Sequence, residues 1–130
     1  MNGGSLAVTA DIDSTALTTG ILAFNDKNMK VGGAIKGPVE FYDLTIPSGK
    51  TLTPGASTTI TVRHSMTIHS GGSYSTTNSP TLVLGGIHSA DLGTYTDLNG
   101  TAVNLGTVTV SGSYTKTLAS ALHGTCSIAK

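Results

Sequence analysis

The chain has 130 residues, which suits one domain of ordinary size with one hydrophobic core. Charged side chains make up 11 % of the residues and cancel to a net charge of zero. Such a low charge argues against a disordered chain. The single arginine, Arg63, argues against direct nucleic-acid binding, because each phosphate contact usually takes a lysine or arginine.

The first 38 residues differ from the rest of the chain. Leu6, Val8, Ala10 and Ile12 alternate with polar residues, which predicts a strand. The glycine-rich stretch that follows carries half of the lysines and is expected to be a loop or an arm that contacts a neighbour. We therefore predict two parts, an N-terminal strand with an arm or loop over 1–38 and a β-domain over 39–130.

The N-terminus lacks the basic head and apolar run of a signal peptide, and no window has the 18 apolar residues of a membrane helix. We expect a chain that is made in a cytoplasm and has no membrane partner.

Strands are predicted over the middle of the chain. Val39–Ile46 is one, and Thr51–Thr53 is a short edge segment. The clearest alternation runs from Ile60 to Ile68 and predicts one long strand, or two strands that are bent near His64 and Ser65.

The last third of the chain begins with two more predicted strands, Leu82–Leu84 and Val103–Val110. The second is interrupted by Gly106, where the parity of the apolar positions changes, and this indicates a β-bulge. Over 113–124, leucine and alanine positions share a helical face, and Gly124 is placed as a C-terminal cap. The pattern predicts a short C-terminal helix.

Three segments, 52–62, 81–97 and 105–113, resemble an immunoglobulin-like domain in the correct order. The second contains the pattern Asp-x-Gly-x-Tyr as Asp91, Gly93 and Tyr95. The resemblance implies a structural corner in which Tyr95 hydrogen-bonds to the chain upstream and Asp91 fixes the turn. It implies an all-β fold, an antiparallel β-sandwich (immunoglobulin-like or jelly-roll-like) with an N-terminal arm and a short C-terminal helix.

The match departs from that family at the core. Val62 and Asp97 stand where the two cysteines would be, and the chain has no tryptophan. Its one cysteine, Cys126, cannot form an internal disulfide. Stability is expected to come from packing, hydrogen bonds or association with other chains.

The sequence predicts no catalytic residue, no cofactor and no metal site. There is no Gly-x-Ser-x-Gly motif, and His64 and His69 are expected on opposite faces of a strand, where they cannot share a metal. Asp11 and Asp13 could share a strand face, but they lack the interleaved Asp/Asn-Gly spacing of a calcium loop.

Composition and the immunoglobulin-like segments together resemble accessory proteins of tailed-bacteriophage particles, such as decoration or fibre proteins. This implies a structural virion protein, assembled in the host cytoplasm, that binds capsid or tail subunits and copies of itself as an oligomer. Two alternatives stay open. One is an extracellular filament or adhesion subunit that is assembled by strand exchange, and the other is a small RNA-phage coat protein, which the neutral charge opposes.

Overall fold

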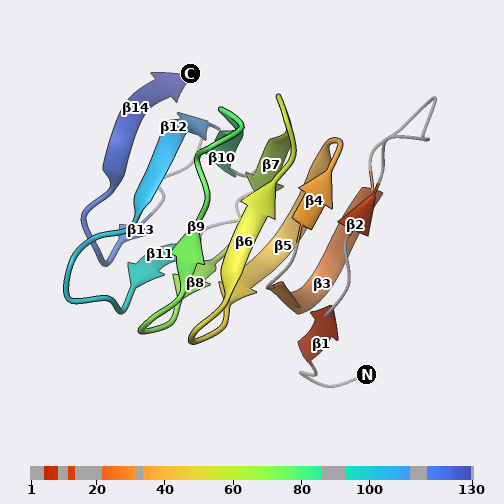
Figure 1. Ribbon diagram of the computed structural model, residues 1–130, viewed down its shortest axis with the longest axis horizontal. Coiled ribbons are helices and arrows are strands. Elements are labelled where there is room, and N and C mark those ends of the chain that lie inside the picture. The colour runs from red at the N-terminus through yellow and green to blue at the C-terminus, as the bar shows by residue number, and fades with distance from the viewer. Residues whose placement is uncertain are drawn as a thin grey trace.

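The computed structural model describes residues 5–8, 12–13, 22–31, 34–85, 93–111 and 117–129, and these residues form strands joined by turns. In chain order the strands are β1 (Ser5–Val8), β2 (Ile12–Asp13), β3 (Leu22–Val31), β4 (Ala34–Lys36), β5 (Val39–Ile46), β6 (Thr51–Pro54), β7 (Thr59–Val62), β8 (Met66–Ile68), β9 (Ser73–Tyr74), β10 (Thr81–Gly85), β11 (Thr94–Asp97), β12 (Asn104–Ser111), β13 (Thr117–Leu118) and β14 (His123–Ala129). The strands stack along one direction, with β1 at one end of the stack and β14 at the other (Figure 1).

Every strand pairing among the described residues is parallel. The predicted antiparallel sandwich is therefore wrong, and the fold is a β-solenoid in which each turn of the chain lies on the previous one. The prediction failed because a period of two identifies a strand with one buried face but does not give the direction of its neighbour. Each strand here pairs with a strand one full coil of the chain further on. The sequence therefore contains no short hairpin turn that would show which strands pair.

Three sides can be followed along the solenoid. The first side contains the first half of β5, then β7, β10, β12 and β14 in that order. The second contains the later half of β5, then β8, β11 and β13. The third contains β2, β4, β6 and β9. Because β5 pairs with both β7 and β8, it crosses the corner between the first two sides.

Buried apolar residues stack in columns inside the solenoid. One column contains Val39, Ile60, Leu82 and Val108, and another contains Leu44, Met66 and Tyr95. All seven are at most 1 % exposed. At about 1.5–3 kcal/mol for each large apolar side chain that is fully buried, these columns are the main source of stability.

Several predictions of local structure are confirmed. β5 covers the predicted Val39–Ile46, and the alternation from Ile60 to Ile68 forms two strands, β7 and β8, with the chain bent between them. Gly106 has a φ of 69°, and the register of β12 against β14 shifts between Asn104 and Thr107. The predicted bulge is therefore present.

The predicted C-terminal helix is wrong. Thr117 and Leu118 form β13, and Gly124 lies in β14 with a φ of 146°. The backbone is held by its neighbours along the solenoid, since Ala119 N donates to Tyr95 O at 2.9 Å. Pairing with existing strands overrides the modest helix preference of leucine and alanine in a segment of one or two turns.

Residues before 39 also contribute strands to the same sheets. β3 pairs with β5 across the predicted boundary, and β4 pairs with β6. Ile35 is fully buried in the core. The division of the chain at residue 38 stays a prediction.

Candidate functional site

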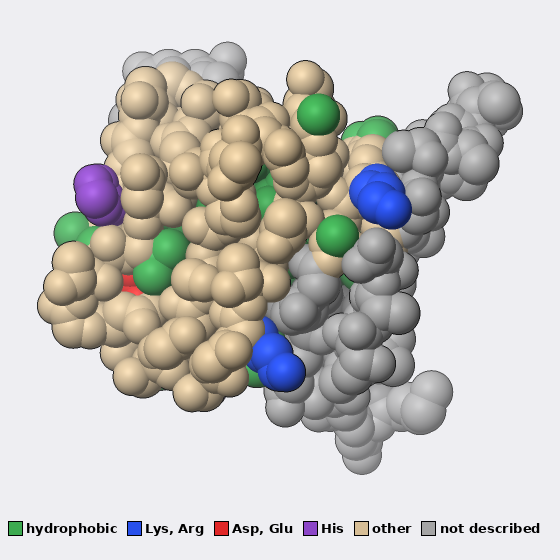
Figure 2. Space-filling view, viewed as in Figure 1, with side chains coloured by type: hydrophobic (Ala, Val, Ile, Leu, Met, Phe, Trp, Pro, Cys, Tyr) green, Lys and Arg blue, Asp and Glu red, His purple; other side chains and the backbone are tan. Residues whose placement is uncertain are grey.

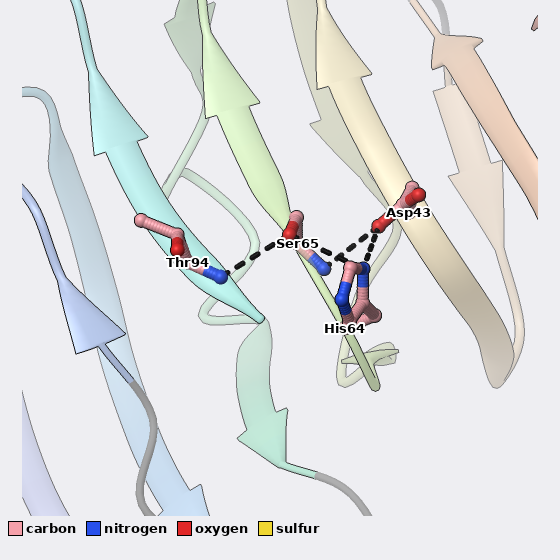
Figure 3. A network of polar contacts seen from close by, with 4 residues as sticks. All are labelled: Asp43, His64, Ser65 and Thr94. Atoms are coloured by element: carbon pink, nitrogen blue, oxygen red, sulfur yellow. Dashed lines mark hydrogen bonds and ion pairs between the residues drawn. The ribbon is translucent and has the colours of Figure 1, made fainter. Parts of the chain in front are cut away.

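A polar cluster stands where the chain turns from the first side of the solenoid to the second (Figure 3). Asp43 comes from the bend of β5, and His64 and Ser65 come from the link between β7 and β8. Asp43 Oδ1 lies 2.7 Å from His64 Nδ1 and accepts a hydrogen bond from Ser65 N at 2.9 Å. Ser65 Oγ accepts from Thr94 N at 3.1 Å, so the cluster ties three successive coils together.

An aromatic contact completes this corner. The His64 ring stacks on Tyr42 with 4.7 Å between ring centroids and 7° between planes. The His64 and Asp43 side chains are 30 % and 26 % exposed. His64 is therefore half-buried at the corner.

The cluster contains a serine, a histidine and an aspartate, yet its geometry differs from that of a hydrolytic triad. In a triad the carboxylate and the hydroxyl contact different ring nitrogens of the histidine. Here both Asp43 Oδ1 and Ser65 Oγ lie near Nδ1, at 2.7 and 3.3 Å. A single ring nitrogen cannot donate a hydrogen bond to the carboxylate and at the same time accept the proton of the hydroxyl. These contacts can therefore position the corner but do not activate Ser65.

Removal of the Asp43 carboxylate should destabilise the protein, because the Ser65 amide loses its acceptor. We expect Asp43→Ala to lower the free energy of unfolding by about 2 kcal/mol. Asp43→Asn keeps one acceptor oxygen and should cost about half as much. Urea denaturation measures both. An Asp43→Ala value within about 0.5 kcal/mol of the wild type would contradict this role.

A second polar cluster is centred on Asp97, at the end of β11. Its carboxylate accepts from Val103 N at 2.7 Å, Asn99 N at 3.0 Å and Asn99 Nδ2 at 2.8 Å. Asn99 Oδ1 accepts from Gly71 N at 2.8 Å, and Ser120 Oγ accepts from Asp97 N at 2.8 Å. The cluster thus bridges the coils before and after β11.

Asp97 is 9 % exposed and occupies the column position next to Ile68. Burial by itself raises the pKa of the carboxyl, but the hydrogen bonds from Val103 and Asn99 outweigh it and leave the pKa below its ordinary value of 3.8. The charged form is therefore stabilised in the folded protein.

Two of the three residues of the predicted corner lie within the described residues. Asp91 lies outside the described residues. Gly93 is buried directly before β11, and a Cβ atom there would overlap the backbone carbonyl of His64. Tyr95 is 1 % exposed within the inner column, and its hydroxyl has no hydrogen bond of good geometry to another described residue, although it interacts electrostatically with the Asp97 carboxylate. Burial, with Asp97 nearby, raises the pKa of that hydroxyl.

The described residues contain no group of three or more His, Cys, Asp or Glu side chains that could hold a metal ion. Asp11 lies outside them, and β2 includes Asp13. Nor does the described part of the chain include a helix that is long and apolar enough to cross a membrane.

Comparison of the chain with family models, curated proteins and solved structures finds no match. Its function has to be inferred from its own geometry.

Sequence reasoning did not single out Asp43 or the bridging role of Asp97. A signal was present in both cases. Asp43 interrupts the apolar residues of β5, and Ser65 follows it by 22 positions, close to the length of one coil. The equivalence of the two positions becomes visible only when the coils are aligned.

Proposed function

We propose that this chain is a structural subunit of a virus particle, such as a decoration or other accessory protein, that acts by binding other virion proteins and copies of itself. The neutral composition, with 11 % charged residues and no net charge, supports a binding role. As a solenoid, the chain presents flat sides and two ends to its partners.

The observation that carries the proposal is the open end of the core at β13 and β14. The column through Val108 continues to Cys126, which is exposed, and the column through Tyr95 continues to Leu118, which is 49 % exposed. No described residue covers these column ends. Such column ends can receive a partner, because an apolar stacking position can be covered and an unpaired strand edge can pair.

The outer surface is consistent with assembly in large numbers. The face in Figure 2 is covered mainly by uncharged side chains and backbone, with few charged groups. Neutral surfaces allow many copies to approach one another without mutual repulsion. Weak contacts can then add through multivalency on a lattice.

Leu118 and Leu98 provide a matched pair for a test of this end. Both are exposed leucines, at 49 % and 52 %, but Leu98 is not in a core column. We expect the wild type to self-associate, Leu118→Asp to abolish association and Leu98→Asp to retain it. Size-exclusion chromatography with light scattering measures the mass. A wild type that stays monomeric at high concentration, or equal effects of both variants, would count against docking at this end.

Electron microscopy of the native source with a labelled antibody tests the particle itself. Label on capsids or tails supports the proposal, and label on cell-surface filaments would replace it with the filament alternative. One observation favours that second candidate. β14 is an edge strand among the described residues, and parallel strand addition by a neighbour would extend the solenoid.

A further inference from the structure

The outward face of the first side carries two straight rows of side chains, seven of which have a hydroxyl group and one of which is a valine. One row runs across four paired strands as Thr59, Thr81, Thr107 and Thr125. The second row lies two residues further along the same strands as Thr61, Val83, Thr109 and Ser127. All eight side chains are half-buried or exposed, while the residues between them on β7, β10 and β12 point into the core.

The array has a fixed repeat in two directions. Paired strands are about 4.8 Å apart, and alternate residues on one strand are about 6.6 Å apart. Threonine is branched at Cβ, which restricts its χ1 rotamers, so methyl and hydroxyl groups recur at constant positions. Neighbours within a row also support each other, as shown by the 3.2 Å contact between Thr109 Oγ1 and Ser127 Oγ.

The array carries no charge and no aromatic ring. The nearest charges along the second row are at β5, where Glu40 is the partner of Thr61 and pairs with Arg63 at 3.4 Å. An uncharged face of this kind fits an uncharged partner whose own groups repeat at a constant spacing.

We propose that this threonine array binds ice. The inference does not rest on the proposed virion role, since it concerns the outward-facing side chains of the first side, whereas that role rests on the core columns and the strand edge at β13 and β14. Water in ice is uncharged, donates and accepts hydrogen bonds, and repeats in a lattice. Each threonine hydroxyl can donate one hydrogen bond and accept two, so it can bond to lattice waters, each of which donates two and accepts two, while the methyl groups restrict the orientation of the water between the rows.

Size argues against a soluble protein as the partner. The four strands of the array span about 14 Å, and its two rows are about 7 Å apart. The backbone positions of the eight residues therefore mark out an area of roughly 100 Å². A stable protein interface needs roughly 800 Å² on each partner. Small molecules and sugars are usually held in concave sites with aromatic or charged groups, and this array offers neither group. Ice is made of the solvent itself, so many weak contacts with its surface suffice.

Ice growth measured with a nanolitre osmometer tests the proposal. We expect the wild type to hold an ice crystal at constant size over a gap between melting and growth temperatures. Thr107→Lys, at the centre of the array, should reduce this gap at least about five-fold, because a long charged side chain disrupts both the spacing and the neutrality. Thr125→Lys, at its edge, should have a smaller effect in the same direction.

Thr101→Lys is the matched control, since Thr101 is exposed but lies outside the array. It should leave the gap unchanged. Circular dichroism and thermal unfolding of all variants establish that the solenoid is intact, which is expected because the substituted side chains are exposed. The proposal is overturned if the wild type has no effect on ice growth, or if the control loses as much activity as Thr107→Lys. Two further measurements are made on the same variants, namely self-association and retention on a polysaccharide resin. The proposal is also overturned if Thr107→Lys leaves the temperature gap unchanged and abolishes either of these properties.

Discussion

Gly93→Ala should unfold a large fraction of the protein at temperatures where the wild type is folded. An added Cβ atom would overlap the carbonyl group of His64, which belongs to the backbone and cannot rotate away as a side chain could. The strain can be relieved only if β11 moves away from the β7–β8 corner, which would weaken the hydrogen bond from Thr94 N to Ser65 Oγ. We expect a loss of about 3 kcal/mol or more, at the upper end for single substitutions.

Gly100→Ala is the control for this prediction. Nothing lies within 4 Å of a Cβ atom at Gly100, and its φ is outside the left-handed region. Its free energy of unfolding should change by about 0.5 kcal/mol or less. Chemical denaturation of both variants measures the difference, and similar values for the two would mean that the close approach at Gly93 is not a constraint.

Asp97→Ala is expected to have the second largest effect. Three donors, two from Asn99 and one from Val103, would lose their acceptor, and a cavity would form beside Ile68. Buried donors that lose a charged acceptor cost about 1–3 kcal/mol each, but partial access of water will reduce the sum. We expect a total loss of about 3 kcal/mol, again by chemical denaturation.

The lowered pKa of Asp97 also predicts that the free energy of unfolding depends on pH. Because the pKa of Asp97 is lower in the folded state, its contribution is fully present above the ordinary value of 3.8. The contribution is lost as the pH falls through the lower folded-state pKa. Asp97→Asn cannot titrate, so the stability gap between wild type and variant should be widest at neutral pH and should narrow in acid. A gap that stays constant down to pH of about 2 would contradict this linkage.

The sequence by itself determined which residues form strands and which faces are buried in the middle of the chain. Val39–Ile46, the bend near His64 and the bulge at Gly106 could all be predicted from alternation and from one glycine. These features depend on local patterns, because a strand with one buried face must alternate wherever its neighbours lie.

The candidate sites could be predicted only in part. The sequence did identify Gly93 and Tyr95, but the reason was a resemblance to a β-sandwich, and the protein does not have that fold. The threonine rows were missed because the number of residues between successive members of a row varies. Thr59, Thr81, Thr107 and Thr125 are separated by 22, 26 and 18 positions, so no fixed repeat is visible.

Only the tertiary structure decided the direction of the strands, the order of the three sides and the conformation of the C-terminal segment. The loops that complete successive coils differ in length, yet the strands of these coils align. Their alignment is set by backbone hydrogen bonds and by the packing of the columns. Leu118 and Gly124 could be predicted as helical from local preference, yet pairing with β11 and β12 made them strand residues. Local preference is worth a few tenths of a kcal/mol per residue, and a row of strand hydrogen bonds outweighs it.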